Sequence, residues 1–236
     1  MHTHQKFTMN GNNKIDRLSQ GGKREETSFC SLLDEASNVA RRVLESIQAI
    51  AGTTACKGVQ IHGLEKFAVR NGYLINRMDD YGSFADRGSE NEVYTSFDNN
   101  YVFKLNDFRY SDDNLDSFFE RISAHNALFP DCAYECVGFA YNQNRKFCAV
   151  LKQPFIHAER EATEEEITHK LTKLGFAPQF DGEYFSNGQY DIFDALPNNV
   201  LKGSDGNLYF IDTIIYRTDS QNLATYKSLS PRYSKE

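Results

Sequence analysis

The most informative stretch of this chain runs from Asp194 to Asp212 and reads D-A-L-P-N-N-V-L-K-G-S-D-G-N-L-Y-F-I-D. The segments 200–201 and 208–211 have the apolar and aromatic composition of strands. Between them, residues 203–207, Gly-Ser-Asp-Gly-Asn, are typical of a tight connection. The stretch therefore predicts a β-hairpin, with Asp194 and Asn199 ahead of its first strand and Asp212 directly after its second.

The polar residues that flank this hairpin suit phosphoryl transfer. Moving an ATP phosphate requires an acceptor oxygen held in line and Mg²⁺ bound by hard oxygen ligands. Asp194 is the candidate that orients or deprotonates an acceptor hydroxyl, and Asn199 and Asp212 are the candidate metal ligands. Asp191 is a rival for the catalytic carboxylate, but the five-residue spacing to Asn199 favours Asp194. An ordinary structural hairpin is the alternative interpretation, because Asp, Asn and Gly are common turn residues.

Upstream of this hairpin, one charged residue, Lys104, lies in a predicted strand that is otherwise largely apolar. Residues 88–94, G-S-E-N-E-V-Y, predict a turn and a strand, and residues 101–105, Y-V-F-K-L, predict the next strand. Lys104 is flanked there by apolar residues, which is a poor position for an ammonium without a partner. A helix predicted over about residues 112–128 follows, and Glu120 in its middle is the candidate partner of Lys104. Alternatively, Lys104 lies on an edge strand and Glu120 faces water.

Taken in order, these elements resemble the protein-kinase-like superfamily. The resemblance is closer to the serine/threonine/tyrosine kinase-like domain of bacterial polyvalent proteins from phages and mobile elements. It covers about residues 64–216. The stretches that carry it are L-E-K-F-A-V-R-N-G-Y, G-S-E-N-E-V-Y, V-F-K-L-N-D, A-V-L-K-Q-P-F-I, G-F-A-P-Q-F and D-A-L-P-N-N-V-L with the following Y-F-I-D.

The resemblance implies an α+β, small two-lobed protein-kinase-like fold, with an antiparallel N-lobe sheet and a reduced helical C-lobe. ATP and Mg²⁺ would bind between the lobes. Lys104 would contact the phosphates with Glu120 as its anchor, and Asp194 would be the catalytic carboxylate. Asn199 and Asp212 would bind Mg²⁺.

The resemblance also implies further nucleotide contacts. Gly88 and Ser89 would belong to the turn that covers the phosphates. Residues 149–156 would run through the last strand of the N-lobe into the hinge, where backbone groups around Lys152 and Gln153 would bind the adenine edge.

Several positions depart from the family pattern. Ile192 and Phe193 replace the usual His and Arg before the catalytic Asp, and Asp212 is followed by Thr213 rather than by Phe and Gly. Two glycines of the phosphate-covering turn are also missing. We expect the stretch after Asp212 to be too short for a peptide-binding helical subdomain. The acceptor is therefore a hydroxyl of unknown identity, on a small molecule or a protein, and the alternative is a catalytically inactive nucleotide-binding or protein-interaction module.

Composition limits the remaining partners. The chain has 236 residues, a net charge of -7 and 40% hydrophobic residues, which is enough for a sizeable core. Its pI of about 5.4 argues against a nucleic-acid or membrane-surface binder. The five cysteines include no C-x-x-C pair, and no signal peptide or transmembrane run is present, so we expect a cytoplasmic protein with reduced thiols.

Four segments are expected along the chain. Residues 1–27 are polar and predicted to be flexible, residues 28–63 hold an amphipathic helix and a connection, residues 64–216 form the kinase-like domain, and residues 217–236 form a polar tail. The helix over 28–50 has a complete apolar stripe that packs on the N-lobe or forms a dimer or partner surface. A short helix is expected over 64–71, and another over 163–174, with acids first and lysines last.

Overall fold

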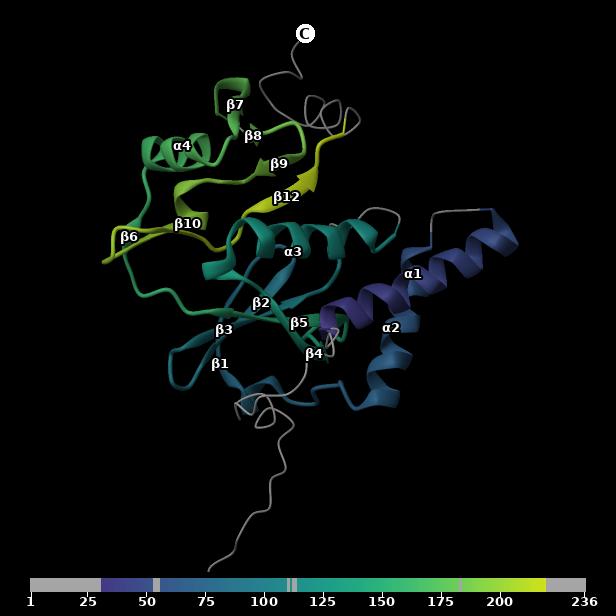
Figure 1. Ribbon diagram of the computed structural model, residues 1–236. Helices are drawn as coiled ribbons and strands as arrows, with labels where there is room; N and C mark the ends of the chain where they lie inside the picture. Colours follow the sequence, from purple (N-terminus) through teal and green to yellow (C-terminus); the bar gives the residue numbers. More distant parts are fainter. Residues whose placement is uncertain (1–30, 53–55, 110, 112–113, 183, 220–236) are drawn as a thin grey trace, which may run out of the picture.

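The structure of the chain, a computed structural model, describes residues 31–52, 56–109, 111, 114–182 and 184–219. Within these ranges it contains four α-helices and three antiparallel sheets, which confirms the α+β class (Figure 1). The predicted flexible segment 1–27 and nearly all of the predicted tail lie outside the described residues. No helix in the described ranges combines the length and apolar character needed to cross a bilayer.

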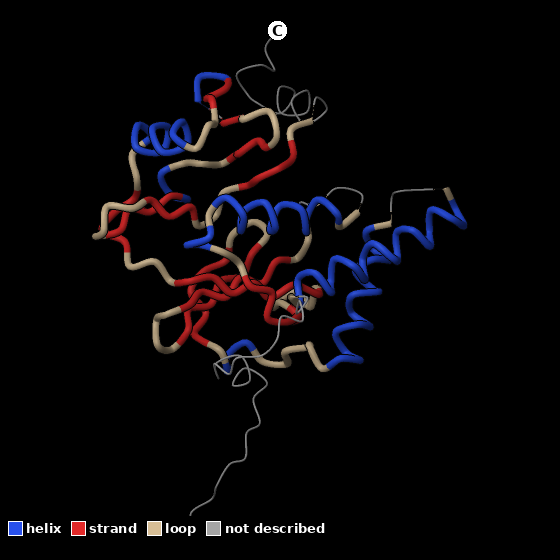
Figure 2. The backbone as a smooth tube through the Cα atoms, in the orientation of Figure 1, coloured by secondary structure: helices blue, strands red, loops and turns tan. Residues whose placement is uncertain are grey.

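A five-stranded sheet forms the first half of the structure (Figure 2). Its order is β1-β2-β3-β5-β4, and every neighbouring pair is antiparallel. Hairpins join β1 to β2, β2 to β3 and β4 to β5, whereas helix α3 connects β3 to β4. The strands are β1 Gly82–Arg87, β2 Asn91–Ser96, β3 Tyr101–Asn106, β4 Glu135–Tyr141 and β5 Phe147–Pro154.

Three helices pack on one side of this sheet. They are α1 Leu32–Ala51, α2 Lys57–Asn71 and α3 Asp116–Leu128. Buried side chains from all three join one face of the sheet in a shared hydrophobic core. α1 turns its buried face toward α2, α3 and β4, and Ile50 near its end is 88% exposed. Packing on the half that contains the five-stranded sheet is thus observed for this helix, while a dimer or partner surface stays a prediction.

Two helix boundaries differ from the sequence-based expectation. α1 begins after Ser31 rather than at residue 28, and the Ser31 side chain forms a capping box with Asp34; the helix ends at Ala51, before Gly52, close to the expected end at residue 50. α2 begins at Lys57 rather than in the mid-sixties, so much of the predicted connection is helical. Gly58 and Gly63 lower helix propensity there. At Gly63 an added Cβ would lie 2.8 Å from Val43 Cγ2, so glycine permits the close approach of α1 and α2.

The second half contains small sheets and one helix. One sheet has the order β11-β10-β6 and the other β12-β9-β8-β7. Their buried residues and the helix α4 form a separate core, which α3 also contacts through Ala124. The elements are β6 Ala158–Glu161, α4 Glu164–Lys173, β7 Ala177–Gln179, β8 Tyr184–Ser186, β9 Tyr190–Phe193, β10 Val200–Gly203, β11 Leu208–Phe210 and β12 Ile214–Arg217.

α3 lies between the two halves and contacts both (Figure 1). It packs against β12 on one side and contributes Phe118 and Ile122 to the core of the five-stranded sheet on the other. The predicted hairpin of β10 and β11 is confirmed, and so is the helix predicted over 163–174, which runs over Glu164–Lys173 with Thr163 as its cap. The two halves also meet directly where Lys104 of β3 contacts Ile211 and Asp212, which follow β11.

Candidate active site

Lys104 is the polar centre of the contact between the two halves. It lies on β3 and is only 7% exposed. Its ammonium donates to three oxygens: Tyr134 Oη at 3.2 Å, the Ile211 carbonyl at 2.7 Å and Asp212 Oδ1 at 3.2 Å. Burial by itself would lower the pKa of Lys104, but Tyr134 and the Asp212 carboxylate outweigh it and raise the pKa to about 12. The side chain is therefore charged at neutral pH, and all three N–H groups are used.

Asp212 reaches this contact from the other half of the chain. Its side chain is 50% exposed, in contrast to the buried ammonium that it pairs with. The residue before it, Ile211, contacts the segment that carries Asp194 and Asn199, because the Ile211 N–H donates to the Asn199 backbone carbonyl at 2.9 Å. One carboxylate oxygen thus faces Lys104 at the edge of solvent.

Asn199 and Asp194 form the neighbouring pair. Asn199 closes the short 3-10 helix Pro197–Asn199 and is buried, and its Nδ2 donates to the Asp194 carbonyl at 2.9 Å. Asp194 has φ 56, a left-handed conformation that Asp adopts more readily than most residues. Partial burial and the nearby charge of Asp212 raise the pKa of Asp194, and a hydrogen bond from Asn199 opposes that shift. The spacing predicted from the sequence thus places these three residues together.

Glu120 does not meet Lys104, contrary to the predicted pair. Its side chain is 58% exposed and lies 3.8 Å from Arg217 Nε. The reason is the rotation of α3, which turns Phe118, Arg121, Ile122 and His125 inward. These positions recur at helical spacing on one face, and Glu120 falls outside it. The partners of Lys104 are Tyr134 and Asp212 instead.

The predicted phosphate-covering turn lies beside the end of β3. The register pairs Asn91 with Asn106, so the turn 88–90 adjoins the strand that carries Lys104. Gly88 and Ser89 are exposed, and the Gly88 N–H donates to the Asn91 carbonyl at 2.9 Å. The next residue, Glu90, forms a 2.9 Å ion pair with the nearly buried Arg121 of α3. A contact of Gly88 or Ser89 with phosphate stays a prediction.

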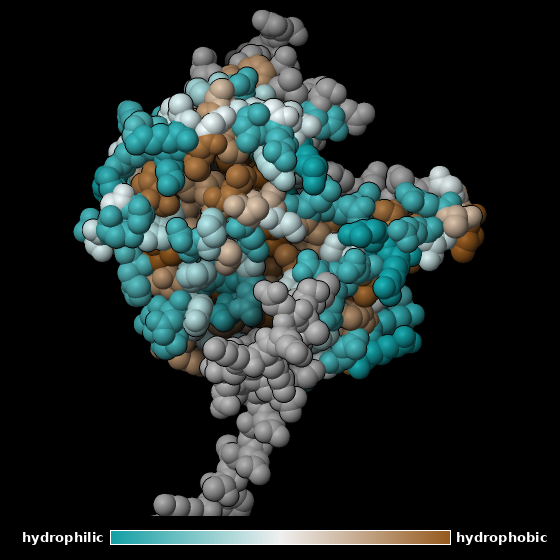
Figure 3. Space-filling model, in the orientation of Figure 1, coloured by the Kyte–Doolittle hydropathy of each residue, from teal (hydrophilic) through white to brown (hydrophobic). Residues whose placement is uncertain are grey.

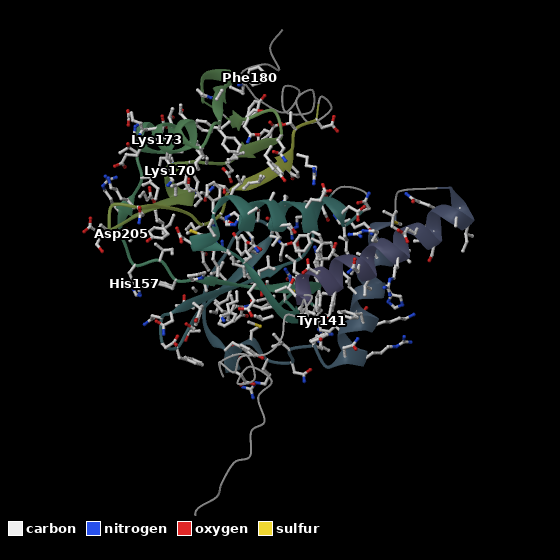
Figure 4. All side chains as sticks on the ribbon, in the orientation of Figure 1. Tyr141, His157, Lys170, Lys173, Phe180 and Asp205 are labelled. Atoms are coloured by element: carbon white, nitrogen blue, oxygen red, sulfur yellow. The ribbon has the colours of Figure 1, made fainter. Side chains whose placement is uncertain are left out.

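Gln153 lies near the end of β5, where the predicted hinge begins. Its side chain is buried and donates to the Cys132 carbonyl at 2.7 Å, so that amide is already engaged. The neighbouring Lys152 pairs with Glu135 and lies over the ring of Tyr101. Adenine recognition by backbone groups of this segment remains a prediction. Figure 4 shows His157, on the connection from β5 to β6, at the outer edge of the molecule.

Two further residues, Tyr134 and His125, shape the site and were not among the residues predicted from the sequence. Tyr134 Oη donates to the Ile211 carbonyl at 2.7 Å and also contacts Lys104. His125 Nε2 donates to the Phe210 carbonyl at 2.8 Å, and burial together with the charge of Lys104 lowers the pKa of His125 to about 4. His125 shares the helical face of Phe118 and Ile122, which is a usable sequence signal. Tyr134 carries no such pattern.

The side-chain oxygens of Asp194, Asn199 and Asp212 are too few to bind Mg²⁺ by themselves, so a bound phosphate and water would have to complete its coordination. Within the described ranges, no three His, Cys, Asp or Glu side chains gather as a metal site. Asp194, Asn199 and Asp212 supply two carboxylates and one amide, and Mg²⁺ is commonly bound by one or two carboxylates together with substrate phosphates and water. This set therefore fits a metal that arrives with a nucleotide.

A separate cavity of about 340 Å³ lies on another side of α3. Glu120 lines it together with residues of α1, β9 and β12, and none of Lys104, Asp194, Asn199 and Asp212 does. On the face drawn in Figure 3, apolar surface gathers over β10, between α4 and α3. The candidate active-site residues therefore lie outside the cavity that Glu120 lines.

Comparison with known proteins agrees with the resemblance drawn from the sequence. Residues 57–219 match the family model described as the serine/threonine/tyrosine kinase found in polyvalent proteins. The match includes the whole of α2, whereas the domain predicted from the sequence began at residue 64, inside this helix. No curated protein matched the sequence. Since the family model spans well over half of the chain, the protein belongs to the family of serine/threonine/tyrosine kinases found in polyvalent proteins.

Proposed function

We propose that this protein transfers the terminal phosphoryl group of ATP to a hydroxyl acceptor. In this proposal the five-stranded sheet with α3 forms one lobe of a two-lobed kinase-like fold, and β6 to β12 with α4 form the other. The observation that carries the proposal is the contact of Lys104, from the first half, with Ile211 and Asp212 from the second. Family membership supports the use of a nucleotide.

Asp212 and Asn199 are the residues that would hold Mg²⁺. The metal would supply neutralisation of the negative charge on the phosphate oxygens. Asp212 fits this role because its half-exposed carboxylate is accessible to a ligand. Asn199 fits because its carbonyl and its Nδ2 are both fixed by backbone contacts, to Ile211 and Asp194 respectively.

Lys104 has to exchange one partner to bind a phosphate oxygen. Its three N–H groups are used in the structure, and two of their acceptors, Tyr134 and the Ile211 carbonyl, are buried or belong to the backbone. Asp212 is the exposed partner, and its contact at 3.2 Å is longer than the 2.7 Å contact with the Ile211 carbonyl. When the Asp212 carboxylate turns to a metal, one N–H of Lys104 becomes available for a phosphate oxygen. The ion pair therefore keeps the carboxylate and the ammonium close to the positions where they would bind metal and phosphate.

Asp194 is the group that would accept the proton of the acceptor hydroxyl. Its raised pKa makes it a stronger base than an ordinary Asp. Asn199 fixes the Asp194 backbone, so the carboxylate direction is set by a residue of the same loop. In the proposed transfer step, Asp194 thus accepts the proton, Lys104 binds a phosphate oxygen, and Asn199 and Asp212 would hold the metal.

Thermal unfolding and phosphate transfer together test this function. MgATP is expected to raise the melting temperature of the natural chain, because a ligand that binds only the folded state stabilises it. Asp212→Asn keeps an acceptor for Lys104 but removes the charge, and should lose both the Mg²⁺-dependent rise and phosphate transfer. Asp131→Asn, an exposed acid outside the site, is the matched control and should behave as the natural chain does.

The outcomes separate the two candidate functions. A Mg²⁺-dependent rise without transfer to any acceptor or to the chain itself would favour the nucleotide-binding module. The absence of any rise at millimolar MgATP, in a natural chain that is folded, would refute the nucleotide site altogether. Transfer that persists in Asp212→Asn would show that Asp212 is not the metal ligand.

A further inference from the structure

Tyr134 lies where the two halves meet, and its hydroxyl has two partners. It donates to the Ile211 carbonyl at 2.7 Å and accepts from Lys104 Nζ at 3.2 Å. Both donor and acceptor capacity are used, because a phenol has a single hydrogen. The same carbonyl also accepts from Lys104 at 2.7 Å, so Tyr134, Lys104 and Ile211 form a closed triangle.

Tyr134 is itself held in place by α3. Asn126 binds both of its backbone groups: the Tyr134 N–H donates to Asn126 Oδ1 at 2.7 Å, and Asn126 Nδ2 donates to the Tyr134 carbonyl at 2.8 Å. The ring lies 4.7 Å from the His125 ring. The Tyr134 side chain is therefore positioned by groups that a nucleotide would not touch.

His125 holds the last residue of β11, Phe210, which directly precedes Ile211. Its Nε2 donates to the Phe210 carbonyl at 2.8 Å. Phe129 stacks on the Phe210 ring with centroids 4.2 Å apart. Phe210 and Ile211 directly precede Asp212. The Phe210 carbonyl thus accepts from the His125 side chain and the Ile211 carbonyl from the Tyr134 side chain.

We infer that Tyr134, supported by His125, is a positioning residue that aims Asp212 and Lys104 at the nucleotide. This inference rests on the proposed function. Tyr134 takes the anchoring role that the sequence analysis gave to Glu120. A neutral phenol holds the ammonium without cancelling its charge, whereas a carboxylate would neutralise it. Once Asp212 turns to a metal, Lys104 therefore keeps its full charge for a phosphate.

The test compares Tyr134→Phe with Tyr94→Phe. Both changes remove one hydroxyl from a buried tyrosine of the same half, and Tyr94 is outside the Lys104 contacts. The first readout needs no nucleotide: amide hydrogen exchange of the peptide covering residues 208–214. Tyr134→Phe should speed this exchange roughly tenfold through the lost hydrogen bond, and Tyr94→Phe should not.

The second readout is the Mg²⁺ concentration that gives half of the ATP-induced rise in melting temperature. Tyr134→Phe should require roughly tenfold more Mg²⁺, because Asp212 is no longer aimed, while Tyr94→Phe matches the natural chain. Unchanged exchange in Tyr134→Phe overturns the anchor. Faster exchange with an unchanged Mg²⁺ requirement also overturns the inference, since Tyr134 would then be only structural. A natural chain without any nucleotide response refutes the proposed function instead, and with it the positioning role, whatever the exchange shows.

Discussion

Acidification should destabilise this protein through His125, by an amount that follows from its environment. The imidazole is 1% exposed, and burial and the nearby Lys104 lower its pKa to about 4 from 6.5. Between these two values the unfolded chain binds a proton that the folded chain does not. Folding stability is therefore complete above about pH 6.5 and falls as the pH drops toward 4. A shift of this size corresponds to about 3 kcal/mol, since each pKa unit is worth about 1.4 kcal/mol.

The comparison that isolates this term uses His125→Gln. Glutamine does not titrate, and its amide can donate to the Phe210 carbonyl in place of Nε2. The surrounding charged or titratable groups, Lys104, Tyr134 and Asp212, remain in both proteins. Urea denaturation of both chains should therefore show the natural chain losing about 2.5 kcal/mol more than the variant between about pH 7.5 and about pH 4.5.

Either of two results would contradict the reasoning. Parallel pH curves for the natural chain and His125→Gln would mean that the imidazole charges as easily in the folded state as in the unfolded one. A natural chain that instead loses stability more slowly than the variant on acidification would reverse the sign, and would place His125 beside a negative charge rather than beside the ammonium of Lys104.

Three further changes test the packing and the charges. Phe118→Ala should lower the free energy of unfolding by about 3–5 kcal/mol in urea denaturation, because the ring is almost fully buried in the core. Arg121→Ala should cost about 3 kcal/mol by leaving Glu90 without its partner in a nearly buried position, and a double-mutant cycle with Glu90→Gln should show strong coupling; additive losses would argue against the pair. Glu120→Gln should change stability by less than about 0.5 kcal/mol and leave the MgATP-induced rise in melting temperature intact; loss of that rise would restore Glu120 as the Lys104 partner.

Local chemistry explains which elements could be predicted. The hairpin of β10 and β11 was visible because Gly203 to Asn207 is a strong turn sequence between two apolar runs. The end of α1 was predicted to within one residue, and Gly52, with φ 64, terminates the helix there. The start of α4 was predicted at Thr163, whose capping box with Glu166 is a sequence signature. The start of α2 was missed because its glycines disfavour a helix when read locally. There, Gln60 bonds the Ala40 carbonyl and the Leu115 N–H, contacts that exist only after packing.

The candidate site shows the same division. Spacing along one loop was enough to group Asp194, Asn199 and Asp212, because a short hairpin returns the chain to its starting point. The partner of Lys104 depends on the rotation of α3 and on the path of the chain into β4, and both are set by long-range burial. A helix of known bounds can present any of its faces until a core selects one. The family and the order of the elements could thus be inferred from local patterns alone, whereas the choice of Tyr134 rather than Glu120 as a partner of Lys104 depends on long-range packing.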